Sequence, residues 1–155
     1  MAHSAFPDLA DAIYAILNVP ALTAPPPIGA GARRVVDQPV LAADDDRIPF
    51  PFVWYELGSE RSSGGLGPGP WLLEVDIRIH VFSQSNGMQE AQGIAQKVIE
   101  LLRAAEKSGT LDVNGWWSWY QPHDDTITLP FELLNGDAVR ELVVANRAYV
   151  EERIA

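Results

Sequence analysis

The sequence predicts an α+β domain in which a mainly antiparallel sheet of about four to five strands carries two helices on one face. Three observations predict this class. Residues 71–84 alternate strictly between apolar and polar side chains, residues 86–108 repeat apolar side chains at helical spacing, and strand-like runs lie before and after that helix. The order is a helix, a long loop, two strands, a helix and two or three strands, which favours a helix-covered sheet.

The first helix is predicted at about residues 7–18. Asp8 and Asp11 favour the positive end of the helix dipole, and Asn18 and Pro20 are expected to end the helix. The apolar residues recur at positions i, i+3, i+4 and i+7, the spacing of an amphipathic helix: Leu9, Ala12, Ile13, Ile16 and Leu17.

A long irregular arm is expected at residues 19–50 of a single domain that spans residues 1–155. Pro25–Pro27 break any helix, Arg33–Val36 could form a short strand, and Asp44–Asp46 form a charged turn. A connection of this length with little regular structure is unusual inside a compact domain. Two interpretations stay open: a surface loop, or an arm that orders against a neighbouring subunit.

A long antiparallel hairpin is predicted next. Phe52–Gly58 is rich in aromatic and β-branched residues and predicts a strand, whereas residues 59–70 hold four glycines and two prolines and predict a flexible loop. The second strand, at residues 71–84, has one apolar face and one charged face. Its apolar face holds Trp71, Leu73, Val75, Ile77, Ile79 and Val81, and its charged face holds Glu74, Asp76, Arg78 and His80.

The second helix is expected to begin at Asn86, an N-cap residue with Gln89 three positions later, and to end at Gly109. Its apolar stripe covers about 20 residues: Met88, Ala91, Ile94, Ala95, Val98, Leu101, Leu102 and Ala105.

The C-terminal part of the chain is predicted to return to strands. Residues 116–121 predict one strand, Thr126–Leu134 is a candidate for another, and Arg140–Val150 predicts the last. Asn135–Gly136–Asp137 is a hairpin-type turn, and His123–Asp125 predicts a polar turn after the aromatic strand.

Composition excludes several classes of function. The chain contains no cysteine, so disulfides, thiolate catalysis and cysteine-based metal sites are excluded. Its net charge of −10 argues against a protein that adheres to DNA or to anionic membranes. Because the first residues lack the features of a signal peptide and no apolar run could span a bilayer, we expect a soluble protein made in the cytoplasm.

Motifs for chemistry are weak, and we expect no catalytic residues, no cofactor and no metal. Gly65-x-Gly67-x-Gly69 leads into a strand and does not complete a phosphate-binding motif. Asp44–Asp46 lacks the spaced ligands of a calcium loop. His80 is expected to be a surface or interface residue, since it follows Arg78 on the polar face of a strand.

Two surfaces remain as candidates. Trp117 and Trp119 share one face of their predicted strand, which suggests a core or protein interface; the alternative is a platform over Trp116–Tyr120 that stacks sugars or bases. The charged strand face of Glu74, Asp76, Arg78 and His80 either meets solvent or faces an adjacent subunit or a channel. An acidic channel would let DNA pass without sticking.

Three segments together resemble one family. PFVWYELGSE (51–60), LLEVDIRIHVFSQSNGMQEAQGIAQKVIELL (72–102) and RELVVANRAYVEE (140–152) are similar to the tail completion or tail terminator proteins of long-tailed bacteriophages and gene-transfer particles. In this family a strand ends near a polar tripeptide, here Val81-Phe82-Ser83, and an Ala- and Ile-rich helix follows. This chain departs from the family pattern at residues 22–50 and 112–135, which are longer than in the family.

The resemblance implies a structural protein of the virion and no enzyme. Such a protein forms a ring, expected here to be a hexamer, at the head-proximal end of the tail; it stops tube growth and joins the tube to the head connector. The implied partners are further copies of this chain, the tail tube protein, the head–tail connector or stopper protein, and DNA that passes through without specific binding. Assembly in the host cytoplasm and no membrane contact are implied as well.

A ring needs two different contact patches on each subunit. The charged strand face is the candidate for a channel or subunit interface, and Trp117 and Trp119 are the candidate aromatic interface. The candidate docking loop comprises Ser59, Glu60, Arg61, Gly64, Gly65 and Leu66. The alternatives are a head-side neck or stopper protein, a ligand-binding module on the Trp116–Tyr120 platform, and an enzyme with an acidic site at His123–Asp125.

Overall fold

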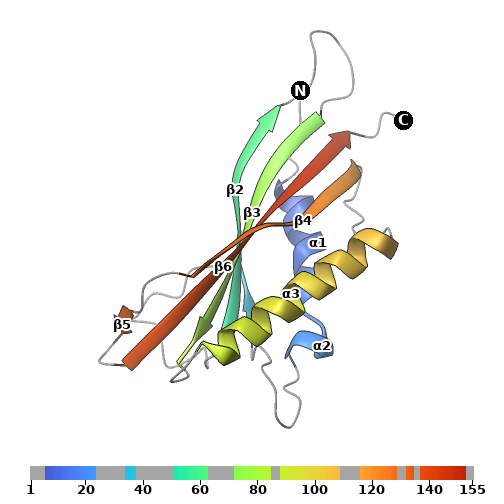
Figure 1. Cartoon of the computed structure of the whole chain (residues 1–155). Helices are drawn as coiled ribbons and strands as arrows, with labels where there is room; N and C mark the ends of the chain where they lie inside the picture. Colours follow the sequence, from blue (N-terminus) through green and yellow to red (C-terminus); the bar gives the residue numbers. More distant parts are fainter. Residues whose placement is uncertain are drawn as a thin grey trace.

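A computed structural model describes residues 6–23, 34–37, 51–62, 72–84, 88–108, 116–128, 132–134 and 137–152. Their fold is α+β, as predicted: one face of a twisted sheet carries the helices (Figure 1). The elements in chain order are α1 (Phe6–Leu17), α2 (Pro20–Thr23), β1 (Arg34–Val36), β2 (Phe52–Ser62), β3 (Leu72–Ser83), α3 (Gln89–Ser108), β4 (Trp116–Thr128), β5 (Glu132–Leu134) and β6 (Asp137–Glu152).

The sheet has the strand order β1-β2-β3-β6-β4, and β5 pairs with β6 at one end. The β2–β3, β3–β6, β4–β6 and β5–β6 pairs are antiparallel, whereas β1 runs parallel to β2. The predicted hairpin of β2 and β3 is confirmed, and its register sets Trp54 opposite His80. The described residues form six strands and three helices, more than predicted, because the short elements β1, β5 and α2 add to the longer ones.

The core lies between the sheet and the helices. The apolar positions of β3 predicted from the alternation are buried, and they face the apolar stripes of α1 and α3. Burying each such side chain contributes about 1.5–3 kcal/mol relative to exposure, so this layer dominates the stabilisation. The fully buried members include Leu9, Ile13, Val75, Ile77, Ile79, Ile94, Val98 and Leu102.

Polar contacts fix α3 to its neighbours. At the end of β3 the buried hydroxyl of Ser83 donates a hydrogen bond of 2.6 Å to Oε1 of Glu90, in the first turn of the helix. Further along, the ammonium of Lys97 donates to the carbonyl of Ala21 in α2. The predicted N-cap Asn86 lies outside the described residues, and α3 begins at Gln89.

In the N-terminal half one predicted boundary is confirmed and another is wrong. The first helix ends as predicted, since α1 stops at Leu17; Pro20 is the first residue of a separate short helix, α2, a position where the missing N–H of proline is tolerated. Segments of the predicted arm therefore belong to the fold, as α2 and β1. The first strand of the hairpin does not stop at Gly58 but continues to Ser62, because after a register shift between Leu57 and Ser59 the long strand β3 still offers backbone partners.

The predicted turn at His123–Asp125 is also wrong. These residues lie within β4, which runs unbroken from Trp116 to Thr128. The register passes from Gln121 opposite Arg147 to Asp125 opposite Ala145, so β4 carries extra residues there. A bulge absorbs them and the strand continues, which the polar composition of this stretch did not predict.

Candidate functional site

The candidate site is the outer face of the sheet, defined as the face opposite the helices on β2, β3 and β6. The three helices pack against the other face, where the core lies (Figure 1). The register places the following residues on the outer face: Phe52, Trp54, Glu56, Glu74, Asp76, Arg78, His80, Phe82, Glu141, Val143, Ala145, Arg147 and Tyr149.

His80 is at the centre of a polar cluster that joins three strands. Its Nε2 lies 3.0 Å from a carboxylate oxygen of Glu56 on β2, and its Nδ1 lies 2.5 Å from a carboxylate oxygen of Glu141 on β6. The indole of Trp54 stacks on the imidazole with ring centroids 4.3 Å apart. We define Trp54, Glu56, His80 and Glu141 as the His80 cluster.

The geometry of this cluster favours the charged imidazole. Both ring nitrogens of His80 face carboxylates, which only accept hydrogen bonds. The imidazole can donate to both carboxylates at once only when each nitrogen carries a proton. Burial opposes the charge and lowers the pKa of His80, but hydrogen bonds to Glu141 and Glu56 outweigh it and raise the pKa above its ordinary value of 6.5. The stacked indole also favours a cation.

A second ion-pair group lies further along the same face. Nε of Arg147 on β6 lies 3.1 Å from Oε1 of Glu74 and 3.6 Å from Oδ1 of Asp76, both on β3. Arg147, Glu74 and Asp76 are each partly exposed, so the pairs are screened and contribute modestly. Arg78 is exposed, and it makes no ion pair with another residue that the structure describes.

The predicted charged stripe is therefore divided into parts with different surroundings. Glu74 and Asp76 share one arginine, Arg78 is exposed, and His80 is buried with 11% of its side chain accessible. Because opposite charges face one another across the strands, the face presents patches of paired charge, not a uniformly acidic surface. Such a face suits contact with a matching polar surface.

The other predicted site residues fall on two strands and a segment outside the described residues. Ser59, Glu60 and Arg61 lie in β2, opposite Asp76, Val75 and Glu74. The rest of the candidate docking loop, Gly64, Gly65 and Leu66, lies outside the described residues.

The candidate aromatic interface is placed by the backbone register. Trp117 lies opposite Glu151 and Trp119 opposite Tyr149, in the half of β4 that precedes the bulge.

Sequence reasoning missed Trp54, Glu56, Glu141 and Arg147 as parts of this face. The sequence did contain a signal for the β2 residues. Phe52, Trp54 and Glu56 alternate with buried residues along β2, in the same way as the outer-face residues of β3 alternate with its buried residues. The sequence did not show the register between the strands, nor that β6 is the second neighbour of β3.

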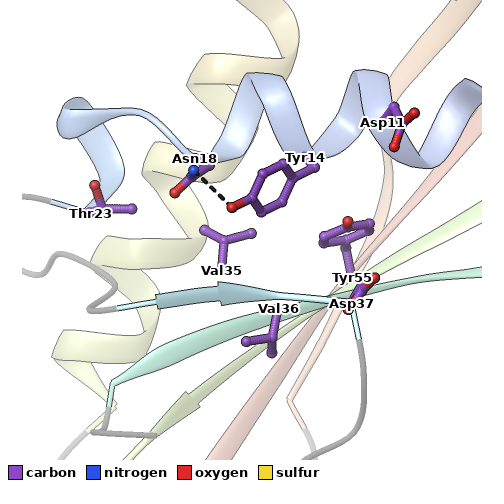
Figure 2. A pocket seen from close by; sticks show the side chains of 8 residues that line it. All are labelled: Asp11, Tyr14, Asn18, Thr23, Val35, Val36, Asp37 and Tyr55. Atoms are coloured by element: carbon purple, nitrogen blue, oxygen red, sulfur yellow. Dashed lines mark hydrogen bonds between the residues drawn. The ribbon is translucent and has the colours of Figure 1, made fainter.

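A groove lies elsewhere, between α1, α2, β1 and the start of β2. Its volume is about 720 Å³, and Figure 2 shows Tyr14 of α1 and Tyr55 of β2 reaching into the space between helix and strand. Nδ2 of Asn18 donates a hydrogen bond of 3.0 Å to the hydroxyl of Tyr14. The remaining lining residues are Asp11, Thr23, Val35, Val36 and Asp37.

Within the described ranges, no helix is long and apolar enough to cross a membrane. Among the same residues, no group of three or more histidine or acidic side chains has a geometry suited to a metal ion.

Comparison with known proteins gave no match to a family model and no match among curated proteins. Solved structures do match. One of them is described as the virion of a native gene transfer agent particle; it is 16% identical in sequence, the match covers 92% of this chain and 91% of that chain, and the TM-score is 0.47.

Proposed function

We propose that this chain is a structural protein of a virion: a tail terminator that assembles as a ring, expected to be a hexamer, caps the tail tube and joins it to the head connector. In this proposal the chain performs no catalysis, and DNA passes through the lumen of the ring. The proposal is independent of the distant structural likeness. It rests on the sequence resemblance and on the arrangement of the outer face.

The segments that resemble the tail terminator family fold as one continuous unit. Residues 51–60 lie in and just before β2, residues 72–102 form β3 and most of α3, and residues 140–152 form β6. These elements are neighbours in the fold, since β3 pairs with β2 on one side and with β6 on the other. The resemblance therefore covers the central sheet and its main helix.

The observation that carries the proposal is the outer face itself. All three described helices lie on the core side, which leaves the long strands β2, β3 and β6 with a broad second face. That face carries aromatic rings beside partly buried ion pairs, as in the stack of Phe52 on Phe82 at 4.8 Å and the His80 cluster. Buried aromatic groups with a polar rim are typical of protein interfaces.

The mass and shape of the protein in solution test the ring. Light scattering should give about 100 kDa for six subunits of 17.0 kDa, and negative-stain images should show a ring with a central hole. If the free protein is a monomer, the same images should be taken after mixing with open tubes of the tail tube protein from the same particle. A chain that forms no ring alone and binds no tube end contradicts the proposal.

Charge reversal on the outer face tests its role as subunit interface or channel wall. Glu74→Lys with Asp76→Lys places two cations beside Arg147 and should hinder ring closure or DNA passage. The matched control is Glu100→Lys with Glu106→Lys, which makes the same charge change on the exposed side of α3. Equal assembly and equal DNA delivery by the two double variants would refute this role of the face.

The head-side neck or stopper protein remains the second candidate of the same class. It differs in what it binds, because a terminator should bind the end of the tail tube and a stopper should bind the head connector. Mixing the ring with each partner separately and imaging the complexes distinguishes the two.

A further inference from the structure

The groove between α1 and β1 has a chemistry that differs from that of the outer face. It lies at the edge of the sheet, where β1 pairs with β2 and α1 packs above them (Figure 2). Its polar lining consists of two tyrosines, two aspartates, an asparagine and a threonine. Aromatic faces beside carboxylates are the combination that attracts an organic cation.

Tyr55 forms part of the wall of the groove. The residue is 5% exposed, and Figure 2 shows its side chain directed from β2 toward α1. The phenol of Tyr55 therefore contributes an aromatic wall and a polar group to the lining of the groove.

Tyr14 supplies an accessible aromatic face beside it. Its side chain is 42% exposed, and its ring centroid lies 6.3 Å from that of Tyr55, with the rings tilted by 42°. The hydrogen bond from Asn18 fixes the Tyr14 hydroxyl. A cation held over this ring could also reach the oxygen of Tyr55.

The groove is also electrostatically negative. Asp11 on α1 and Asp37 after β1 are exposed, and neither forms an ion pair with a cation of the described part of the chain. Burial, with the charges of Asp37 and Asp11 and the neighbouring Tyr14, raises the pKa of Tyr55 to about 12, so its hydroxyl stays protonated at neutral pH. A cation is the ligand that this environment favours.

We propose that this groove binds a basic peptide segment of a partner protein, with an arginine or lysine side chain held over Tyr14 between Asp11 and Asp37. A volume of about 720 Å³ exceeds what one side chain needs and suits a short stretch of peptide. The partner is a different protein of basic character, since this chain carries a net charge of −10 and complementarity favours the opposite sign. The inference does not depend on the proposed function.

The direct test compares two peptides that differ in charge alone. Acetyl-Gly-Ser-Gly-Arg-Gly-Ser-Gly-amide and the same peptide with neutral citrulline in place of arginine are titrated into the full-length protein and followed by amide NMR. We expect the arginine peptide to shift the signals of Asp11, Asn18 and Asp37 and to bind about tenfold more tightly than the citrulline peptide. Equal affinities, or no shifts at the groove, would overturn the proposal.

Variants separate the groove from the overall charge of the protein. The double variant Asp11→Asn with Asp37→Asn should lower the affinity for the arginine peptide about tenfold, and Tyr14→Leu should lower this affinity severalfold. All three residues are exposed, so the fold should survive. Glu106→Gln, an exposed residue of α3, is the single-charge control and should change the affinity less than twofold. The single variant Asp37→Asn makes the same charge change at the groove. If Glu106→Gln lowers the affinity as much as Asp37→Asn does, the effect is one of overall charge and the site is refuted.

Free acetyl-arginine amide identifies the source of the cation. Weaker binding than that of the peptide supports a segment of a partner, because the flanking backbone then contributes. Equal binding by the free amide would overturn the assignment to a peptide segment.

Discussion

His80→Gln should make the free energy of unfolding less dependent on pH between about 5.5 and 9. In the native protein the imidazole lies between Glu56 and Glu141, and these hydrogen bonds raise the pKa of His80 despite its burial. The folded protein then holds a proton that the unfolded chain releases more readily. The stabilisation by His80 is therefore complete below the ordinary pKa of 6.5 and is lost as the pH rises through the folded-state pKa.

The size of the effect follows from the two contacts. A hydrogen bond to a charged group contributes about 1.5–3 kcal/mol, and glutamine can still donate to one of the two carboxylates. We expect the wild type to exceed His80→Gln by about 2 kcal/mol in unfolding free energy near pH 5.5. The difference should shrink with rising pH, with a slope of at most about 1.4 kcal/mol per pH unit, the limit for one proton.

Urea unfolding followed by far-UV circular dichroism measures this difference at each pH. Subtracting the His80→Gln curve from the wild-type curve removes the contributions of His3 and His123, which both proteins share. Glu141→Gln should lower the pH at which the stabilisation by His80 is lost. Glu106→Gln, which changes an exposed residue of α3, should not change this pH. If the difference in unfolding free energy between the wild type and His80→Gln stays constant or grows between pH 5.5 and 9, the imidazole is not held in its charged form.

Three further changes test the packing, each by urea unfolding. Ile94→Ala empties a fully buried position of α3 and should cost about 2–5 kcal/mol; a loss below about 1 kcal/mol would contradict the core assignment. Ser83→Ala removes the 2.6 Å hydrogen bond to Glu90 and should cost about 1–2 kcal/mol, more than Glu90→Gln, which keeps an acceptor. Arg147→Met should cost about 1 kcal/mol or less at low salt, and an equal cost in 1 M NaCl would contradict the ion pair with Glu74.

Regular periodicity made much of the fold predictable. The alternation over residues 71–84 and the apolar stripe over residues 86–108 each gave an element near its observed bounds, since burial on one face imposes that period. The errors fall where backbone pairing outweighs composition. Residues 59–62 and 123–125 are polar and were predicted as loop and turn, but both pair in the sheet beside a register shift.

The sequence predicted which strand carries the candidate site, but not which residues of other strands its side chains contact. The charged positions of β3 were identified, and His80 was expected at a surface or interface. The sequence pattern did not show that His80 lies between Glu56 and Glu141. Those partners are 24 and 61 residues away in the chain, so their approach depends on registers that the sequence pattern does not encode. The tyrosine groove was missed for the same reason, because Tyr14 and Tyr55 meet through tertiary packing alone.

The position of β6 has a consequence for synthesis. This strand lies in the interior of the sheet, between β3 and β4, although it is the last described element to leave the ribosome. Until it arrives, the hairpin of β2 and β3 exposes the backbone edge of β3, which is a template for pairing with other chains. Nascent chains on one messenger should therefore be most prone to aggregate just before β6 emerges, and a chaperone that shields strand edges should raise the yield of soluble protein.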